Sequence, residues 1–495
     1  MVEEEYIRLI FGLKMKQIRN EKDLSLFGLS KKTGLSKSYL NEIEKGKKYP
    51  KRDKILIIAD ALETTYDHLV SLKLDKNLAP IGEILQSRLL KEIPLELFGI
   101  RESDLIDIIA EAPVKVNAFI STLIEIAKHY NLGRESFFLA ALRSYQEAQN
   151  NYFDDLEKKV ELFAKAYNIN LDEKINPDEL EDILREEYGY SFNQEALSEY
   201  SELTNLRSVF VPETKTLLLS QSVDESQKTF IYAKEIAYNY LGIQDRLYTF
   251  SWIKFDSFDQ VLSNFFASYF AGALIIPRKR LGIQLKDFLS QEEWQPELLQ
   301  DMMASFTDSP ETFYQRLTNI LPKDFNMRNI FFLRFSHNPA NDDFRLEKEL
   351  HITNLQEPHA NENNEHYCRR WVGLRTLKQI AATKTKAAFG AQISQYANTD
   401  NEYLVLSSSM EDPFRAGKYR SIALGILHSK DLVNKVPFLK KEPISRMLVG
   451  VTCESCAIPD CNVRAAAPTR LQKKMQNKRT EEVVTELMAR FSRPD

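Results

Sequence analysis

Short amphipathic helices near the amino terminus, interrupted by one glycine, limit the fold of this chain more than any other feature. Leu26 opens a helix that ends near Gly34, where the missing Cβ permits the positive φ of a tight turn. The next helix starts at Ser36, whose hydroxyl suits an N-cap. One face of that helix is predicted to point inward, and it carries Tyr39, Leu40 and Ile43. The pattern predicts two small helices packed across a tight turn.

The outward face of the second helix is polar and basic. It carries Lys37, Ser38, Asn41 and Lys45, and Lys47 follows in the next loop. Nine basic residues stand against three acidic ones between positions 31 and 54, although the whole chain has a net charge of −5. A charge run alone is usually a solvated face, but two helices, a glycine turn and a basic loop in register indicate a surface for the major groove of DNA. We predict that Lys37, Ser38 and Asn41 read bases, with Lys45 and Lys47 as neighbouring DNA contacts.

The stretch from Leu24 to Ser71 resembles the helix-turn-helix domain of phage repressors of the Cro and cI (XRE) type, most strongly in GLSKSYLNEIEKGKKYP. It departs from that family at Ser30, usually a small Ala, and at Leu26, usually a Gln that contacts phosphate. The resemblance implies double-stranded DNA as the partner. It also implies a homodimer whose recognition helices lie about 34 Å apart and read an inverted repeat.

The length and composition of the chain limit the rest of its organisation. At roughly 100 to 200 residues per domain, 495 residues predict three or four domains. The longest uncharged apolar stretch, Val261 to Ile276, is shorter than the roughly 20 residues that span a bilayer. The acidic start, MVEEEY, lacks the basic region of a secretory signal. We expect a cytoplasmic protein with no membrane partner.

The middle of the chain predicts a hairpin in LRSVFVPETKTLLLS and a helix in TFIYAKEIAYNYLG. This resembles the metallopeptidase-like (IrrE/ImmA-type) domain found beside phage-type helix-turn-helix domains, whose helix carries His-Glu-x-x-His. The segment FFASYFAGALIIP resembles the one that supplies its third zinc ligand. Here the ligand positions fall on Lys234, Tyr238 and Asn264, and only Glu235 of the motif remains. Zinc takes imidazole, thiolate or carboxylate ligands, so we predict neither zinc nor proteolysis in this domain.

Three consecutive cations, Arg278, Lys279 and Arg280, follow the apolar stretch. Cations in this place complement the negative end of a helix dipole, and that role alone accounts for most such groups. The other interpretation is that they bind the phosphates of a ligand. We therefore treat them as candidate ligand-binding residues.

All four cysteines lie beyond residue 367. Cys453, Cys456 and Cys461 form C-x2-C-x4-C, and Cys368 is a distant fourth. Free cysteines are often small buried hydrophobes, but three within nine residues indicate a metal chelate. Cytosolic disulfides are uncommon, and structural zinc usually takes two separated C-x2-C pairs. A three-cysteine run with a distant fourth is compatible with an iron–sulfur cluster, which we predict as cofactor with zinc as the alternative.

The order of these features resembles that of the bacterial regulators of short-chain fatty acyl metabolism, including the propionate (methylcitrate-cycle) and glyoxylate-shunt regulators. That resemblance implies a carboxyl half that binds a short-chain acyl-CoA. It also implies an iron–sulfur cluster on the cysteines that match Cys453, Cys456 and Cys461, while Cys368 lies near another family cysteine. The implied function is a DNA-binding transcription regulator that responds to acyl-CoA and to redox state, and not an enzyme.

The predicted fold class is multidomain, with an all-α domain, an α-helical spacer and two α+β domains. The boundaries are 1–75 for the helix-turn-helix domain, 76–168 for a spacer and dimerisation block, 169–305 for the degenerate metallopeptidase-like domain and 306–495 for the carboxyl-terminal domain. Two other functions fit parts of the sequence. One is a metallopeptidase that cleaves a partner repressor, which the missing histidines argue against. The other is a phage-type or antitoxin-type repressor that needs no ligand and holds a structural zinc.

Overall fold

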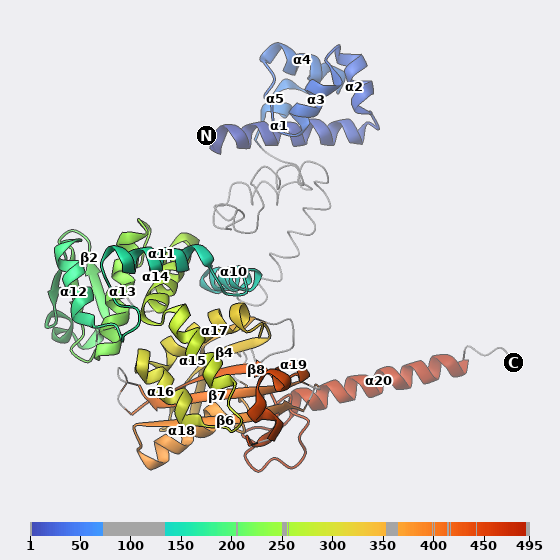
Figure 1. Cartoon of the computed structure of the whole chain (residues 1–495). Helices are drawn as coiled ribbons and strands as arrows, with labels where there is room; N and C mark the ends of the chain where they lie inside the picture. Colours follow the sequence, from blue (N-terminus) through green and yellow to red (C-terminus); the bar gives the residue numbers. More distant parts are fainter. Residues whose placement is uncertain are drawn as a thin grey trace. The chain divides into compact units, whose positions relative to one another are not determined.

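A computed structural model describes residues 2–72 and 134–491, with gaps at 204–205, 250–254, 256, 353–364, 398, 400, 413–414, 416 and 442. The chain divides into two compact units, one of Met1–Tyr145 with Asp256–Phe258 and one of Gln146–Phe255 with Asp259–Asp495 (Figure 1). The part of the predicted spacer between 76 and 133 lies outside the described residues.

The first unit begins with five helices around one apolar core. They are α1 (Val2–Glu21), α2 (Leu26–Thr33), α3 (Lys37–Glu44), α4 (Arg52–Ala61) and α5 (Tyr66–Val70). The core joins Phe11 and Met15 of α1 to Leu29, Leu40 and Ile58 of the next three helices. The predicted all-α domain is confirmed. The break between the two units falls inside the next described helix, α10 (Arg134–Ala148).

The second unit opens with helices around a three-stranded sheet of order β1-β3-β2. The strands are β1 (Ser191–Asn193), β2 (Ser208–Val211) and β3 (Thr216–Leu219), and β2 and β3 form the predicted antiparallel hairpin. The helices are α11 (Asp154–Ala166), α12 (Pro177–Glu186), α13 (Glu225–Tyr240) and α14 (Phe258–Ile275), with 3-10 turns at Ala196–Glu199 and Ser201–Leu203. The predicted helix after the hairpin is α13, which starts at a capping box of Asp224 and Gln227.

The rest of the unit is built on a six-stranded sheet of order β5-β4-β8-β7-β6-β9, antiparallel except where β6 meets β9. Its strands are β4 (Ile330–Asn338), β5 (Asp343–Ile352), β6 (Ala387–Tyr396), β7 (Glu402–Glu411), β8 (Tyr419–Leu427) and β9 (Arg446–Val449). The helices are α15 (Arg278–Leu289), α16 (Pro296–Phe306), α17 (Pro310–Asp324), α18 (Val372–Thr383), α19 (Lys430–Lys435) and α20 (Thr469–Phe491), with a 3-10 turn at Pro437–Lys441. The predicted mixed α and β architecture is confirmed.

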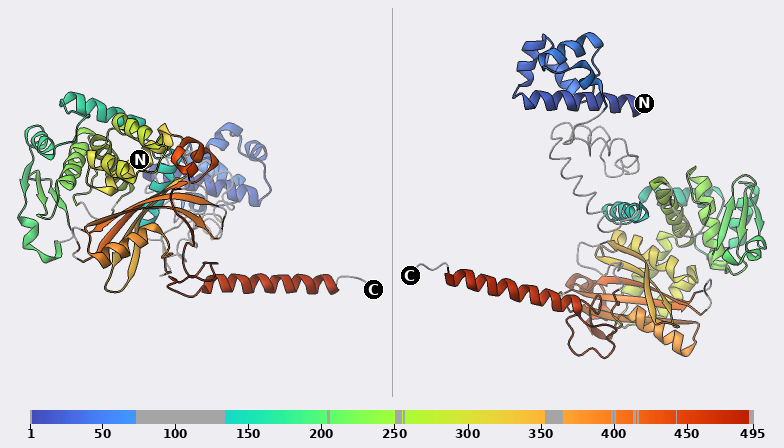
Figure 2. Two further views of the ribbon diagram at one scale, coloured as in Figure 1. Left: turned by 60° about the horizontal axis from the view of Figure 1, so that its bottom comes forward. Right: turned by 180° about the vertical axis from the view of Figure 1, so that it is seen from behind.

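The two faces of the large sheet are covered by different helices (Figure 2). On one face, Phe332 and Leu424 share a continuous core with α13, α14 and α17. On the other, Phe331 and Val405 pack with residues of α18. The predicted boundaries at 168/169 and 305/306 both lie inside the second compact unit, and the second of them falls at the end of α16.

Helix α14 contains the long apolar stretch of the sequence. In the described part of the chain, no helix alone has the length and apolar composition needed to cross a membrane. Helices α14 and α15 meet that test only as a pair bent by 64°. Residues of α14 such as Phe270 and Leu274 are fully buried in the core of the unit, as expected for a core helix.

Candidate nucleic-acid interface and buried polar sites

Local signals set the position and the outward face of α3. The Ser36 side chain accepts a hydrogen bond from the Tyr39 N–H (3.2 Å), and Gly34 has a φ of 69° in the turn before it. Leu40 and Ile43 are completely buried, and Tyr39 is half-buried. This leaves the polar residues of the helix on the opposite face, where Lys37, Ser38 and Asn41 are exposed.

The packing of α3 against α1 is close and partly ionic. A Cβ at Gly12 would lie 2.2 Å from the Ile43 carbonyl oxygen, so only glycine allows the two helices to approach this far. Arg19 donates two hydrogen bonds to the Glu44 carboxylate (2.6 and 3.0 Å) and a third to the Leu24 carbonyl. This buried pair fixes α3 on the long first helix. In the sequence, Gly12 inside α1 is a signal of the close helix contact, but no local pattern points to the Arg19–Glu44 pair.

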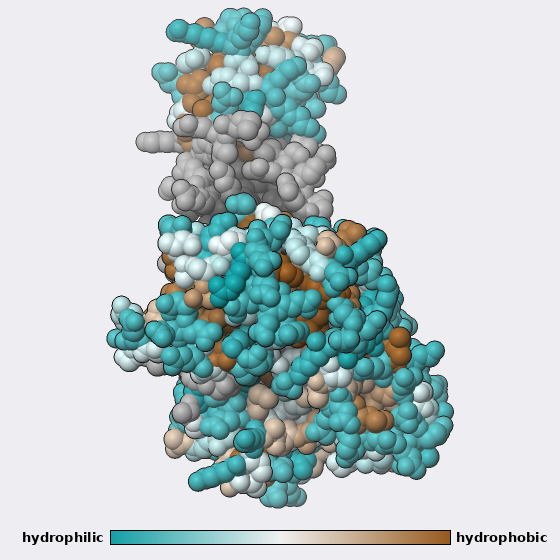
Figure 3. All heavy atoms as spheres, turned by 60° about the vertical axis from the view of Figure 1, so that its left-hand side comes forward, coloured by the Kyte–Doolittle hydropathy of each residue, from teal (hydrophilic) through white to brown (hydrophobic). Residues whose placement is uncertain are grey.

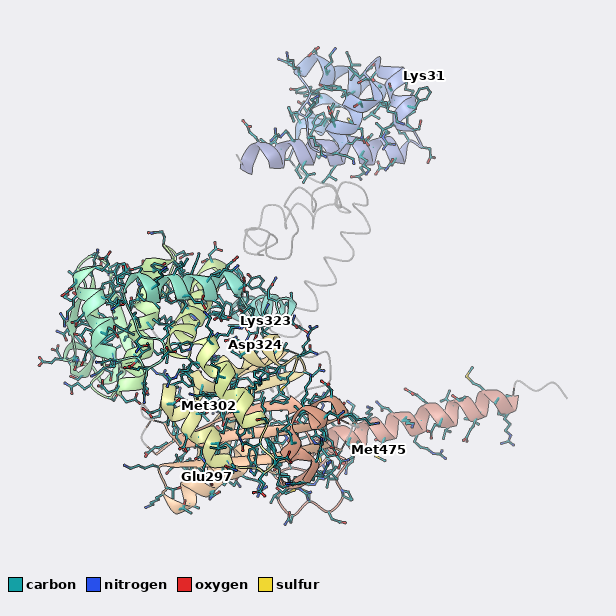
Figure 4. The ribbon with its side chains drawn as sticks, viewed as in Figure 1. Lys31, Glu297, Met302, Lys323, Asp324 and Met475 are labelled. Carbon is teal, nitrogen blue, oxygen red and sulfur yellow. The ribbon has the colours of Figure 1, made fainter. Side chains whose placement is uncertain are left out.

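The basic residues around α3 differ in their exposure to solvent. Lys47 is exposed and Lys45 is half-buried, whereas Lys48 pairs with Glu42 at 2.7 Å, which raises the pKa of Lys48. Lys31 of α2, labelled in Figure 4, lies over the Phe27 ring. On the face drawn in Figure 3, this domain is mostly hydrophilic. The domain therefore presents exposed cations beside α3.

The atypical Ser30 of the motif is accommodated by one hydrogen bond. Its hydroxyl donates to the Leu35 carbonyl oxygen at 2.6 Å, across the turn between α2 and α3. The departure from the usual Ala therefore leaves the turn intact.

The three positions that correspond to zinc ligands in the resembled metallopeptidases come together in the second unit. Lys234 Nζ donates to Asn264 Oδ1 at 2.7 Å, and the Tyr238 hydroxyl lies 3.5 Å from the same oxygen. Burial lowers the pKa of Lys234 to about 7. An ammonium group, a phenol and a carboxamide thus form a hydrogen-bonded set where that family holds a metal.

Glu235, the one residue of the motif that remains, has a buried cation as its partner. Arg246 Nη2 lies 2.6 and 2.7 Å from the two Glu235 oxygens, and the Tyr190 hydroxyl donates to the same carboxylate at 3.0 Å. The guanidinium also lies 4.0 Å from the centre of the Tyr238 ring. A carboxylate held in this way is the partner of an ion pair rather than a base facing water. Arg246 lies outside the motif, so no pattern in the sequence points to it as the partner of Glu235.

The three candidate ligand-binding cations already have protein partners. Arg278 donates to both Asp324 oxygens (2.9 and 2.6 Å) and to the Tyr152 hydroxyl, and Figure 4 labels Asp324. Lys279 pairs with Glu161 at 3.0 Å, and Arg280 donates to the Ser305 carbonyl at 3.2 Å. All three lie in the first turn of α15, so they do not extend the carboxyl end of α14. One nitrogen of Arg280, Nη1, is buried without a hydrogen-bond partner.

Cys368 and Cys456 both lie beside Gly450, just after β9, and Cys453 is near enough to act on Cys368. Cys368, Cys453 and Cys456 are buried, and Cys461 is half-buried. Burial raises the pKa of Cys368 to about 11, with smaller contributions from the Cys456 and Cys453 thiols nearby. Backbone N–H groups donate to these sulfurs, from Gly450 to Cys368 Sγ (3.3 Å), from Arg370 to the same thiol, and from Ala465 to Cys453 Sγ (3.4 Å).

These thiols suit a soft metal in chemistry, because sulfur ligands with N–H neighbours are typical of iron–sulfur sites. A Cβ at Gly450 would lie 2.8 Å from Cys456 Sγ, so only glycine lets the backbone approach that sulfur this closely. In the described residues, however, no three His, Cys, Asp or Glu side chains converge closely enough to hold a metal ion. The four thiols are therefore chemically suited to an iron–sulfur cluster, but their sulfur atoms are not arranged closely enough around one point to bind it.

Comparison with known proteins identifies the first domain. Residues 15–69 match the helix-turn-helix family. A solved structure of a Mycobacterium tuberculosis transcriptional regulator is 18% identical in sequence, with a TM-score of 0.44, and the match covers 66% of this chain and 92% of that one. A search of curated proteins gave no match.

Proposed function

We propose that this DNA-binding, helix-turn-helix transcription regulator acts as a homodimer that reads an inverted repeat. The observation that carries the proposal is the matched domain at 15–69, in which buried contacts from α1 hold α3 with its polar face outward. A two-fold dimer presents its recognition helices about 34 Å apart, one turn of duplex DNA. Lys37, Ser38 and Asn41 then contact base edges, and Lys45 and Lys47 lie beside them at the backbone.

The proposed effector is a short-chain acyl-CoA, bound by the second unit. What supports it is the order of domains along the chain together with the candidate cations on α15. Arg280 is the best placed of these, since its Nη1 is buried without a partner. Arg278 and Lys279 would have to leave Asp324 and Glu161 to reach a phosphate.

The proposed cofactor is an iron–sulfur cluster on Cys453, Cys456 and Cys461 with Cys368 as a fourth ligand, and structural zinc is the alternative. Buried thiols with backbone N–H donors support it. When bound, such a cluster supplies redox sensitivity to the regulator. We propose that the protein is cytoplasmic. Disulfides are uncommon in that compartment, so the thiols would remain free to bind a metal.

We propose that the chain is not an enzyme. The former ligand positions carry Lys234, Tyr238 and Asn264, and Glu235 is neutralised by Arg246. A metallopeptidase needs three metal donors and a free carboxylate at this place.

Two measurements test the effector and the cofactor. Acetyl-, propionyl- and butyryl-CoA should raise the melting temperature of the full chain, because a ligand that binds only the native state stabilises it. Protein purified without oxygen should be brown and contain iron, and Cys456→Ser should lose most of it. Colourless protein with one zinc would favour the alternative, and no shift with any acyl-CoA would remove the effector.

A further inference from the structure

A group of cations from separate parts of the chain lies on one face of the large sheet, and one of them, Arg420, is buried. Arg334 of β4 and Lys348 of β5 are paired in register, and Arg420 of β8 lies opposite Ser336 of β4. Arg207, just before β2, acts electrostatically on the same group. We call Arg207, Arg334, Lys348 and Arg420 the cationic cluster.

Acidic residues pair with some members of the cationic cluster. Glu311, at the start of α17, accepts hydrogen bonds from Arg334 (3.1 Å to each oxygen) and from Lys348 (3.4 Å). Glu347 pairs with Arg334 at 3.2 Å and with Arg415 at 2.8 Å. Asp412 also acts electrostatically on Arg207 and Arg334.

Arg420 has the weakest set of partners in the cluster. The residue is 8% exposed, and in the described part of the chain its guanidinium makes one hydrogen bond, to the thioether sulfur of Met410 at 3.3 Å, and no ion pair. Arg334 Nε is also buried without a hydrogen-bond partner. A thioether is a weak acceptor, and a buried guanidinium normally meets a carboxylate or phosphate. Among the described residues, no carboxylate accepts a hydrogen bond from Arg420.

A break in strand pairing helps to build this place. Arg334 pairs with Lys348 and Phe335 with Leu346, so Glu347 is the extra residue of a β-bulge. Such bulges often lie beside functional sites because they redirect side chains. Arg334 is paired in register with Lys348, and the bulge also brings the Glu347 side chain within reach of Arg334.

Electrostatics agree with the geometry. Burial lowers the pKa of Arg207 and of Lys348, and the neighbouring cations lower both further. Burial alone would raise the pKa of Glu311, but Arg334 and Lys348 hold it well below its usual range. The side chains remain reachable, since that of Lys348 is 43% exposed and that of Arg334 25%.

We propose that the cationic cluster binds an oxyanion, the phosphate or carboxylate group of a small-molecule effector. Guanidinium groups bind both kinds of oxyanion through paired N–H donors, and the buried guanidinium of Arg420 has only a thioether partner among the described residues. Lys234 is close enough for Lys348 and Arg207 to act on it, so the remnant metal position adjoins the cluster. The inference deepens the proposed function and rests on it only in assigning the effector to the second unit.

The test is thermal unfolding of the full chain at constant ionic strength, with sodium chloride replaced in turn by inorganic phosphate, pyrophosphate and propionate. The wild type should melt at a higher temperature with at least one of them. Arg420→Gln should reduce affinity for that anion by about tenfold or more. Without anion it should melt no lower than the wild type, because it removes a buried cation that donates to no carboxylate among the described residues. Lys348→Met provides a second variant, and Arg345→Gln on the same strand, 76% exposed, is the matched control.

The outcomes separate this inference from the acyl-CoA proposal. A phosphate response without a propionate response assigns the oxyanion to phosphate, and the reverse assigns it to a carboxylate. An equal shift in wild type, Arg420→Gln and Lys348→Met, or no shift with any anion, overturns the cluster as a site. If acyl-CoA shifts all three proteins equally, the cluster is wrong while the effector stands. If only simple anions shift the wild type, the cluster stands and acyl-CoA does not.

Discussion

The two units of this protein use their basic residues in opposite ways. In the helix-turn-helix domain Lys37, at the start of α3, and Lys47, in the loop after it, are exposed. In the second unit Arg246 and Arg316 are buried, and each meets a carboxylate, Glu235 or Glu157, at 2.6 Å. Exposed cations together create a positive potential that attracts a polyanion over a distance. Buried cations instead interact mainly with the carboxylates in direct contact with them. A local charge excess in a sequence therefore identifies a partner only where the charges face solvent.

The largest expected effect on stability comes from breaking the buried ion pair of Arg246 and Glu235. Arg246→Met leaves the Glu235 carboxylate buried without a cation and should cost about 3 to 5 kcal/mol of unfolding free energy. Adding Glu235→Gln should recover much of it. Denaturant unfolding of the full chain measures both variants. Arg185→Met, which removes a more exposed pair with Glu181, should cost less than about 1 kcal/mol, and an equal loss in the two single variants would refute the distinction.

A second effect depends on pH and concerns Lys234. Its pKa is about 7 in the folded protein, below the value of about 10.4 for an exposed lysine, so the folded state binds fewer protons between these values. Stability should therefore rise with pH across this window. Lys234→Met should be the more stable protein near pH 7, with an advantage of at most about 4 kcal/mol that closes towards pH 10. A difference that does not change with pH would contradict the burial of this ammonium group.

A smaller effect on stability is expected in the helix-turn-helix domain. Ser36→Ala removes the N-cap of α3 and should destabilise the helix-turn-helix domain by about 1 kcal/mol. Ser38→Ala, in the first turn of the same helix but without a capping role, is the control and should leave stability unchanged. Thermal unfolding followed by circular dichroism compares the two. Equal losses would show that the cap does not hold the recognition helix.

The sequence predicted the first domain well because its signals are local. Ser36 caps within three residues, and Gly34 needs only its own φ. The hairpin at β2 and β3 and the helix α13 were likewise predicted from short patterns. The residue pair that fixes α3 on α1, Arg19 and Glu44, gave no such signal.

The sites of the second unit were harder to predict because their residues meet only in the folded chain. Arg207, Glu311 and Arg420 come from before β2, from α17 and from β8, and no spacing rule connects them. The short run Arg278, Lys279 and Arg280 attracted attention by adjacency, but each residue has its own protein partner. Adjacent cations along the chain are therefore weaker signals of a ligand than cations that converge in space.

Selection of duplexes from a random DNA pool by the purified full chain tests the central claim most directly. We predict enrichment of an inverted repeat with half-sites about one helical turn apart, and binding that weakens as salt rises. Lys37→Ala with Asn41→Ala should lose discrimination for that site, at about 1 to 3 kcal/mol for each base contact. Absence of any enriched sequence, or the same enrichment with the double variant, would contradict recognition of DNA by α3.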